Sequence, residues 1–185
     1  MHIRSRVSAA LAFSTILTVG AGPALAARAR EIDQAVDAAL KKLYAGTPAA
    51  GVLRDKAKGI LVFPSILKAG FIFGAQGGDG ALRKGGKTAG YYRTLAASYG
   101  FQAGIQSFGY ALFFLTDSAL AYLDRSQGWE IGTGPSVVIV DAGMGKSLSS
   151  TTLRNDVYAV IFDQKGLMAG IGIQGSKITK ISPGK

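Results

Sequence analysis

Residues 58–82, KGILVFPSILKAGFIFGAQGGDGAL, decide how the chain folds. Two short apolar runs lie on either side of Pro64 and lead into a glycine-rich tract, which predicts core strands joined by turns. Within this stretch, residues 70–74 have a glycine at each end and an apolar residue next to each glycine. The pattern returns at residues 100–104, 128–132 and 166–170. It indicates either one supersecondary unit used four times or separate strands bounded by turns in a chain with 26 glycines.

The N-terminus has the pattern of a secretory signal. Arg4 and Arg6 precede an apolar run over residues 7–22, and a small-residue sequence ends at Ala26. We therefore expect cleavage after Ala26 and export to the periplasm or out of the cell, where peripheral membrane association is possible. An uncleaved membrane anchor is the alternative, although serine, threonine and glycine dilute the apolar run.

Residues 27–185 are long enough to form one domain with its own core. Removing Arg4 and Arg6 from the 21 basic residues leaves 19 against 11 acidic residues, a net charge of +8 that favours anionic partners. An exported protein meets lipid and envelope polymers more often than nucleic acid, so we expect no nucleic-acid partner. The chain has no cysteine, so it is stable without disulfides.

Three helices are predicted. Residues 28–44 carry apolar side chains at helical spacing, so this amphipathic helix either docks on the core or lies on a membrane. Thr47 and Pro48 are typical of the start of a second helix, which Gly59 ends. A third helix is expected over residues 117–127.

Short strands account for most of the remaining chain. We expect a strand over residues 60–63 to end at Pro64, residues 77–80 to form a turn, and residues 83–87 to form an exposed loop. Further strands are predicted at residues 91–98, 101–115, 129–131 paired with 136–140, 157–162 paired with 167–173, and 177–181. The expected fold is α+β: a curved antiparallel β-sheet, as a sandwich or an incomplete barrel, with about three helices packed outside.

The sequence lacks most catalytic and metal-binding side chains after the signal. Its one histidine, His2, lies in the signal, and there is no cysteine. This excludes histidine acid–base chemistry, thiol nucleophiles and Cys/His zinc sites in the exported chain. Glu130 or Asp141 acting with a lysine is the remaining catalytic alternative. We expect no enzyme activity and no cofactor.

Several of these segments together resemble the signature of SYLF domains, a lipid-binding and actin-regulator-like family. The resemblance extends over residues 32–181, with its clearest motifs at residues 57–64, 68–71, 74–80, 99–104, 112–115 and 128–132. It implies a compact α+β domain that binds anionic phospholipid, with phosphoinositide and actin contacts in some eukaryotic members. Bacterial members resemble exported lipid-binding proteins, and actin binding is not carried over to an exported chain.

The predicted function is therefore association of an exported, non-enzymatic domain with anionic phospholipid. Basic residues on turns would attract the headgroups by about 1 kcal/mol each, and neighbouring apolar residues would insert. The predicted lipid-binding residues are Lys68, Arg83, Lys84 and Lys87, followed by Arg28 and Arg30. The alternative is a structural or protein-partner-binding envelope protein, which an exposed apolar patch without neighbouring basic residues would favour.

Overall fold

A computed structural model describes residues 22–71, 73–99, 104–124, 128–140, 145, 148–149, 151–166 and 172–183. Two helices come first and four long strands follow them: α1 (Gly22–Gly46), α2 (Pro48–Lys56), β1 (Gly59–Phe71), β2 (Phe73–Lys84), β3 (Lys87–Tyr99) and β4 (Gly104–Phe114). The second half contains shorter elements: α3 (Asp117–Ala121), the 3-10 helix η1 (Tyr122–Asp124), β5 (Trp129–Glu130), β6 (Val137–Val140), β7 (Val157–Gly166) and β8 (Lys177–Ile181).

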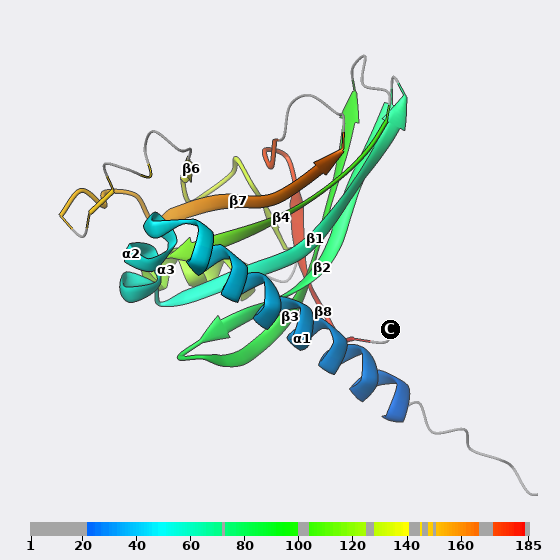
Figure 1. Ribbon diagram of the computed structural model, residues 1–185, viewed down its shortest axis with the longest axis horizontal. Helices are drawn as coiled ribbons and strands as arrows, with labels where there is room; N and C mark the ends of the chain where they lie inside the picture. The colour runs from blue at the N-terminus through cyan, green and yellow to red at the C-terminus, as the bar shows by residue number, and fades with distance from the viewer. Residues whose placement is uncertain are drawn as a thin grey trace, which may run out of the picture.

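All eight described strands belong to one sheet, in the order β5-β8-β3-β2-β1-β4-β7-β6. The sheet curls into a half-barrel, and α1 crosses its outer face (Figure 1). Neighbouring strands are antiparallel except β6 and β7, which are parallel. The α+β prediction with a curved sheet is confirmed in its incomplete-barrel form, and the sheet is mixed because of this one parallel pair.

The two faces of the sheet bury separate cores. The inner, concave face encloses aromatic residues from distant strands together with α3, including Phe63, Tyr92, Tyr110, Phe114 and Trp129. The outer face packs against α1 and α2 through Ile32, Val36, Leu43, Leu53, Val62 and Phe113. The predicted amphipathic helix therefore docks on the core. No helix in the described ranges is long and apolar enough to cross a membrane.

Strand β1 continues through Pro64, so the prediction that this proline ends a strand was wrong. Val62 pairs with Ala81 of β2, whereas further along Leu67 pairs with Gly77, so β1 contains one extra residue between these positions. The same shift appears against β4, between Phe63 and Ile66. Pro64 lies in this β-bulge, where a missing backbone N–H is tolerated.

The predicted turn at residues 77–80 was also wrong, because these residues lie in the middle of β2. A Cβ atom on Gly78 would collide with the carbonyl oxygen of Ser65, and one on Gly80 would collide with that of Val62. These two glycines permit close approach of the β2 backbone to the bulged part of β1.

Other local predictions had mixed outcomes. The exposed loop predicted at residues 83–87 is shorter in the structure: Gly85 and Gly86, both with positive φ, form the β2–β3 turn, whereas Arg83 and Lys84 end β2 and Lys87 begins β3. The third helix begins at Asp117 as predicted, and Thr116 caps it by accepting a 3.3 Å hydrogen bond from the Ala119 N–H. The predicted pairing of residues 129–131 with 136–140 was wrong, because β5 pairs with β8 and β6 pairs with β7 at opposite edges of the sheet. The strand predicted at residues 167–173 lies mostly outside the described residues.

The recurring glycine pattern does not mark one repeated unit. Its first copy, residues 70–74, connects β1 to β2. Its third copy, residues 128–132, contains the two-residue strand β5 and a turn. The other two copies lie largely outside the described residues.

Replacing Gly80 with alanine should destabilise the protein by about 1–3 kcal/mol, because the added methyl group forces β1 and β2 apart. The matched control is Gly51→Ala in α2, where nothing lies within 4 Å of the added carbon. This control should be unchanged or more stable by up to about 1 kcal/mol. Urea denaturation of both variants measures the difference, and equal stabilities would contradict the close approach described for Gly80.

Candidate functional site

The outer face of the sheet is bare and apolar near the free ends of β1–β4. Four large apolar side chains are exposed there: Leu67 by 56%, Phe73 by 73%, Leu95 by 56% and Ile105 by 68%. They come from four adjacent strands. Soluble proteins seldom expose so many large apolar side chains together, and such surfaces usually bind something.

Strand register places these side chains on one face. Leu67 pairs with Gly77, which pairs with Leu95, and the next row toward the strand ends joins Ile105, Ala69, Ala75 and Ala97. The three alanines are exposed as well. We call this surface the bare sheet end, made of Leu67, Ala69, Phe73, Ala75, Leu95, Ala97 and Ile105. None of its members is charged.

The inner face of the same strand ends is polar and buried. Lys68, Gln76 and Gln106 are only 5%, 7% and 4% exposed. The Gln76 side-chain amide donates to the carbonyl oxygen of Gly172 at 3.1 Å and to Ser176 Oγ at 3.3 Å. The usual arrangement of a sheet, apolar inside and polar outside, is therefore inverted at this end.

Two lysines flank the bare sheet end, one on each side. Ser107 of β4 pairs with Lys165 of β7, and Leu95 of β3 pairs with Lys177 of β8. Both lysines are exposed and lie in the same row as Leu67. From edge to edge, this row on the outer face reads Glu130, Lys177, Leu95, Gly77, Leu67, Ser107, Lys165.

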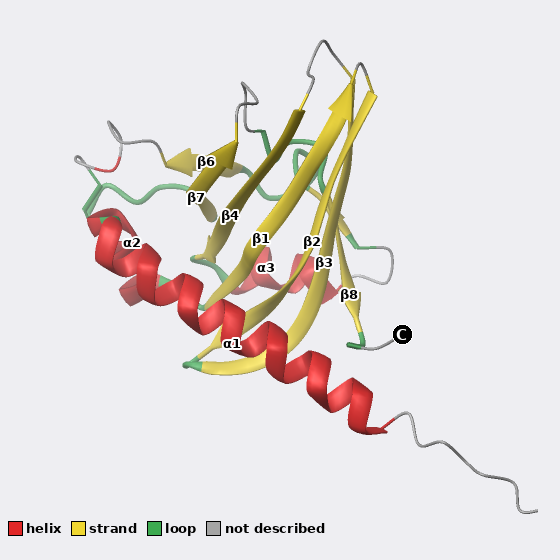
Figure 2. Cartoon of the chain, turned by 45° about the vertical axis from the view of Figure 1, so that its right-hand side comes forward, coloured by secondary structure: helices red, strands yellow, loops and turns green. Residues whose placement is uncertain are grey.

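The bare sheet end begins where α1 leaves the outer face. Figure 2 shows α1 crossing one part of the sheet, while the far parts of β1–β4 extend beyond it. The helix is fixed there by Arg28, whose Nη2 lies 2.7 Å from Asp79 Oδ2 on β2. Asp79 is also bound by Arg93 of β3, with Nε at 2.6 Å and Nη2 at 3.0 Å.

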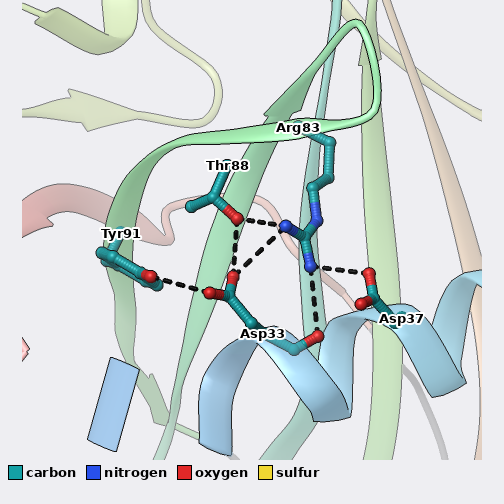
Figure 3. A network of polar contacts seen from close by, with 5 residues as sticks. All are labelled: Asp33, Asp37, Arg83, Thr88 and Tyr91. Atoms are coloured by element: carbon teal, nitrogen blue, oxygen red, sulfur yellow. Dashed lines mark hydrogen bonds and ion pairs between the residues drawn. The ribbon is translucent and has the colours of Figure 1, made fainter. Parts of the chain in front are cut away.

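A second polar cluster, which we call the clasp, fixes the middle of α1 to the opposite end of β2 and β3 (Figure 3). Arg83 Nη2 donates to Asp37 Oδ1 at 2.6 Å and to the Asp33 carbonyl oxygen at 3.1 Å. Arg83 Nη1 donates to Thr88 Oγ1 and lies 3.3 Å from Asp33 Oδ1. Tyr91 and Thr88 donate to the Asp33 carboxylate at 2.9 and 2.6 Å.

The structure separates the six residues that the sequence predicted for lipid binding. Lys68 is buried on the inner face, and the Arg83 side chain is only 10% exposed within the clasp. These two side chains therefore cannot be the exposed contacts that we expected. Lys84 and Lys87 are exposed beside the β2–β3 turn, far from the bare sheet end. Arg28 and Arg30 lie on α1, with Arg28 paired to Asp79.

The bare sheet end and its two lysines were not predicted from the sequence. The alternation of residues 67–76 does contain the signal, because Leu67, Phe73 and Ala75 alternate with Lys68 and Gln76. That pattern does not say which face is covered. Of the two catalytic candidates, Glu130 is exposed on the short edge strand β5, and Asp141 lies outside the described residues.

The amino-acid sequence of residues 95–182 matches the family model described as "Ysc84: Las17-binding protein actin regulator". This match confirms the resemblance to SYLF domains. It contains two of the four large apolar side chains of the bare sheet end, Leu95 and Ile105, and both flanking lysines, Lys165 and Lys177. The description names an actin regulator, and the family is not an enzyme family. No curated protein matches the chain.

Asp79 should make the attachment of α1 sensitive to acid. Hydrogen bonding by Arg93 is the main cause that lowers its pKa below the ordinary 3.8, burial opposes this shift, and Arg28 adds to it. A carboxyl group whose pKa is lower in the folded state contributes stability above its unfolded pKa, and this stability is lost as pH falls through the folded value.

Asp79→Asn should therefore lower the free energy of unfolding by about 1 kcal/mol at pH 7, and the difference from the unmodified protein should shrink below about pH 4. Urea denaturation between pH 7 and pH 3 measures this. Asp55→Asn is the control, because Asp55 pairs with Arg54 on the surface and its replacement should change stability little. A difference for Asp79→Asn that stays constant over this pH range would contradict the argument.

Proposed function

Residues 95–182 belong to the SYLF-type Ysc84 family, and on this premise we propose that the chain is a non-enzymatic, exported protein that associates with anionic phospholipid. The bare sheet end is the surface that enters the membrane. Its four exposed large apolar side chains on one face, between Lys165 and Lys177, are the observation that carries the proposal.

The apolar part of this surface has a geometry suited to the outer region of a bilayer. Phe73, at the strand ends, pairs with Tyr99. Tyr99 lies four residues beyond Leu95 along β3, and Leu95 lies in the row that contains Lys165 and Lys177. Strand rise puts the two rows about 13 Å apart. Amphipathic segments bury their apolar faces about 5–10 Å into the boundary between headgroups and acyl chains. Placing the apolar face of the bare sheet end in that boundary immerses both rows, and the long side chains of Lys165 and Lys177 on its two sides extend to the lipid phosphates.

The energies are sufficient for reversible binding. Four side chains are exposed enough that moving each one from water into the membrane would contribute roughly 1 kcal/mol or more to the binding free energy: Leu67, Phe73, Leu95 and Ile105. The two lysines would add about 1 kcal/mol each near an anionic surface. These contributions are consistent with peripheral association rather than permanent anchoring.

A protein partner is the alternative occupant of the same surface. The apolar side chains alone suit either occupant, but two features favour the bilayer. The bare sheet end lies on the convex face of the curled sheet, which a deformable lipid surface accommodates better than a second rigid convex surface. In addition, exposed lysines lie on both sides of it, whereas a patch without basic neighbours would favour a protein partner.

Vesicle co-sedimentation of the chain that begins at Ala27 tests the proposal, with phosphatidylglycerol-containing vesicles compared with pure phosphatidylcholine. The triple variant Leu67→Ser, Leu95→Ser, Ile105→Ser should weaken binding about 100-fold, through loss of about 3 kcal/mol of apolar transfer. The double variant Lys165→Gln, Lys177→Gln should weaken vesicle binding about 30-fold and make that binding less dependent on salt concentration.

The control is Lys84→Gln with Lys87→Gln, which removes two charges from the β2–β3 turn and should bind as the unmodified chain does. The substituted side chains are exposed, so thermal unfolding should change little in every variant. Equal binding to neutral and anionic vesicles, or loss of binding in the turn variant alone, would overturn the role of the bare sheet end. The second result would favour the turn lysines instead.

Export has a separate test. Among the α1 residues whose burial is described, those buried in the outer core begin at Ile32, so cleavage after Ala26 leaves these contacts in place. Mass spectrometry of the protein recovered from the export compartment should give a chain that starts at Ala27. Recovery of the uncleaved chain in the membrane fraction would support an N-terminal anchor.

A further inference from the structure

We propose that the opposite end of the sheet holds a separate binding site for a phosphate group from the water phase. A cavity of about 310 Å³ lies between α1, the end of α2 and the β2–β3 turn. We call it the basic pocket. Its lining residues are Asp37, Leu40, Tyr44, Arg54, Ala57, Lys58, Gly59, Ile60, Arg83, Gly85 and Gly86. The pocket itself does not depend on the membrane role proposed above, and only the assignment of its ligand to solution rests on that role.

Three cations from three segments converge on the basic pocket. Arg54 lies in the last turn of α2, Lys58 lies between α2 and β1, and Arg83 lies near the end of β2. Ile60 pairs with Arg83, so the chain just before β1 runs next to the turn. Arginine and lysine are the side chains that most often bind phosphate, arginine through its fork of donors and lysine as a compact charge.

The positive charge of this region exceeds its negative charge. Three carboxylates already compensate the two arginines: Asp37 and Asp33 bind Arg83 at 2.6 and 3.3 Å, and Asp55 binds Arg54 at 3.1 Å. The excess positive charge therefore comes from the lysines. Lys58 has no ion pair within the described ranges. Lys84 and Lys87 add two more exposed cations beside the turn, and neither forms an ion pair with another residue that the structure describes. An anion would therefore meet uncompensated positive charge.

Two further donors belong to residues that line the pocket. The clasp uses both terminal nitrogens of Arg83, whereas its Nε is buried and has no hydrogen-bond acceptor in the described structure. A buried donor without an acceptor is unusual in a native fold. Tyr44 packs under Arg54, with the guanidinium carbon 5.1 Å from the ring centre, and burial raises the pKa of its hydroxyl. This hydroxyl stays protonated and can donate.

The size and position of the basic pocket identify the kind of ligand. Small-molecule pockets measure about 300–1,000 Å³, so this one suits a compact phosphate ester. Strand β2 runs for 12 residues from Phe73 at the bare sheet end to Lys84 beside the pocket, a length of about 40 Å. A membrane at the bare sheet end would not reach the pocket, so the ligand comes from solution.

The test uses inorganic phosphate and the full 185-residue chain. Thermal unfolding in sodium phosphate, compared with sodium chloride at equal ionic strength, should give a higher midpoint, and calorimetric titration should give a dissociation constant. Arg54→Gln with Lys58→Gln should raise that constant at least about tenfold, as expected for loss of charge-assisted hydrogen bonds. The double variant Lys84→Gln, Lys87→Gln also removes two positive charges, but from outside the pocket lining. It should change the dissociation constant for phosphate less than about threefold.

Vesicles of phosphatidylcholine with phosphatidic acid distinguish the two sources of the phosphate group. The variant with Arg54 and Lys58 replaced should bind these vesicles as the unmodified chain does, even if the role of the bare sheet end fails its own test. Three results would overturn the proposal: no stabilisation by phosphate, equal weakening in both double variants, or loss of vesicle binding in the pocket variant without any response to phosphate. The last would assign the pocket to a lipid headgroup.

Discussion

The extra residue in β1 at Pro64 is the constraint on which the rest of the structure depends. Side chains alternate between the two faces of a strand, so one additional residue moves every later side chain to the opposite face. Before the bulge, Leu61 and Phe63 point into the inner core. After it, Ile66 and Lys68 take the inner positions, and Leu67 lies outside. The glycines of β2 allow this distorted segment to be paired without a collision.

Helix α1 determines how much of the inverted face stays covered. Its apolar stripe covers the outer face beside β1 and β2, and ion pairs at Asp79 and in the clasp hold it in place. The apolar rows beyond Asp79 receive no cover from any described element. Attachment of α1 and exposure of the bare sheet end are therefore two results of the same packing.

Much of the fold could be predicted from local sequence. The spacing of apolar residues over 28–44 and the Thr47-Pro48 start each depend on neighbours along the chain, and both were found. The turn between β2 and β3 was found too, although with bounds narrower than the predicted loop over residues 83–87. Pro64 and the glycines at 77–80 were misread, because a proline or glycine breaks a strand in most contexts but here serves a contact with another strand. That contact joins residues far apart in sequence.

The candidate site was harder to predict for the same reason. Lys68 was expected to be exposed because lysine usually is, yet the bulge directs it inward. Lys165 and Lys177 flank the apolar rows only through pairings of β4 with β7 and of β3 with β8. No local pattern links these two residues to Leu67 and Leu95. The family resemblance, by contrast, was carried by local motifs and was confirmed.

The continuous β2–β3 hairpin also acts as a rigid spacer. Its ladder joins Phe73–Tyr99 at one end to Lys84–Lys87 at the other, so the separation of the two ends is set by the number of paired residues. Insertions or deletions that keep every side chain on its face must come in twos on both strands, and each such step changes the length by about 7 Å. Relatives of this chain could therefore differ in reach only in discrete steps.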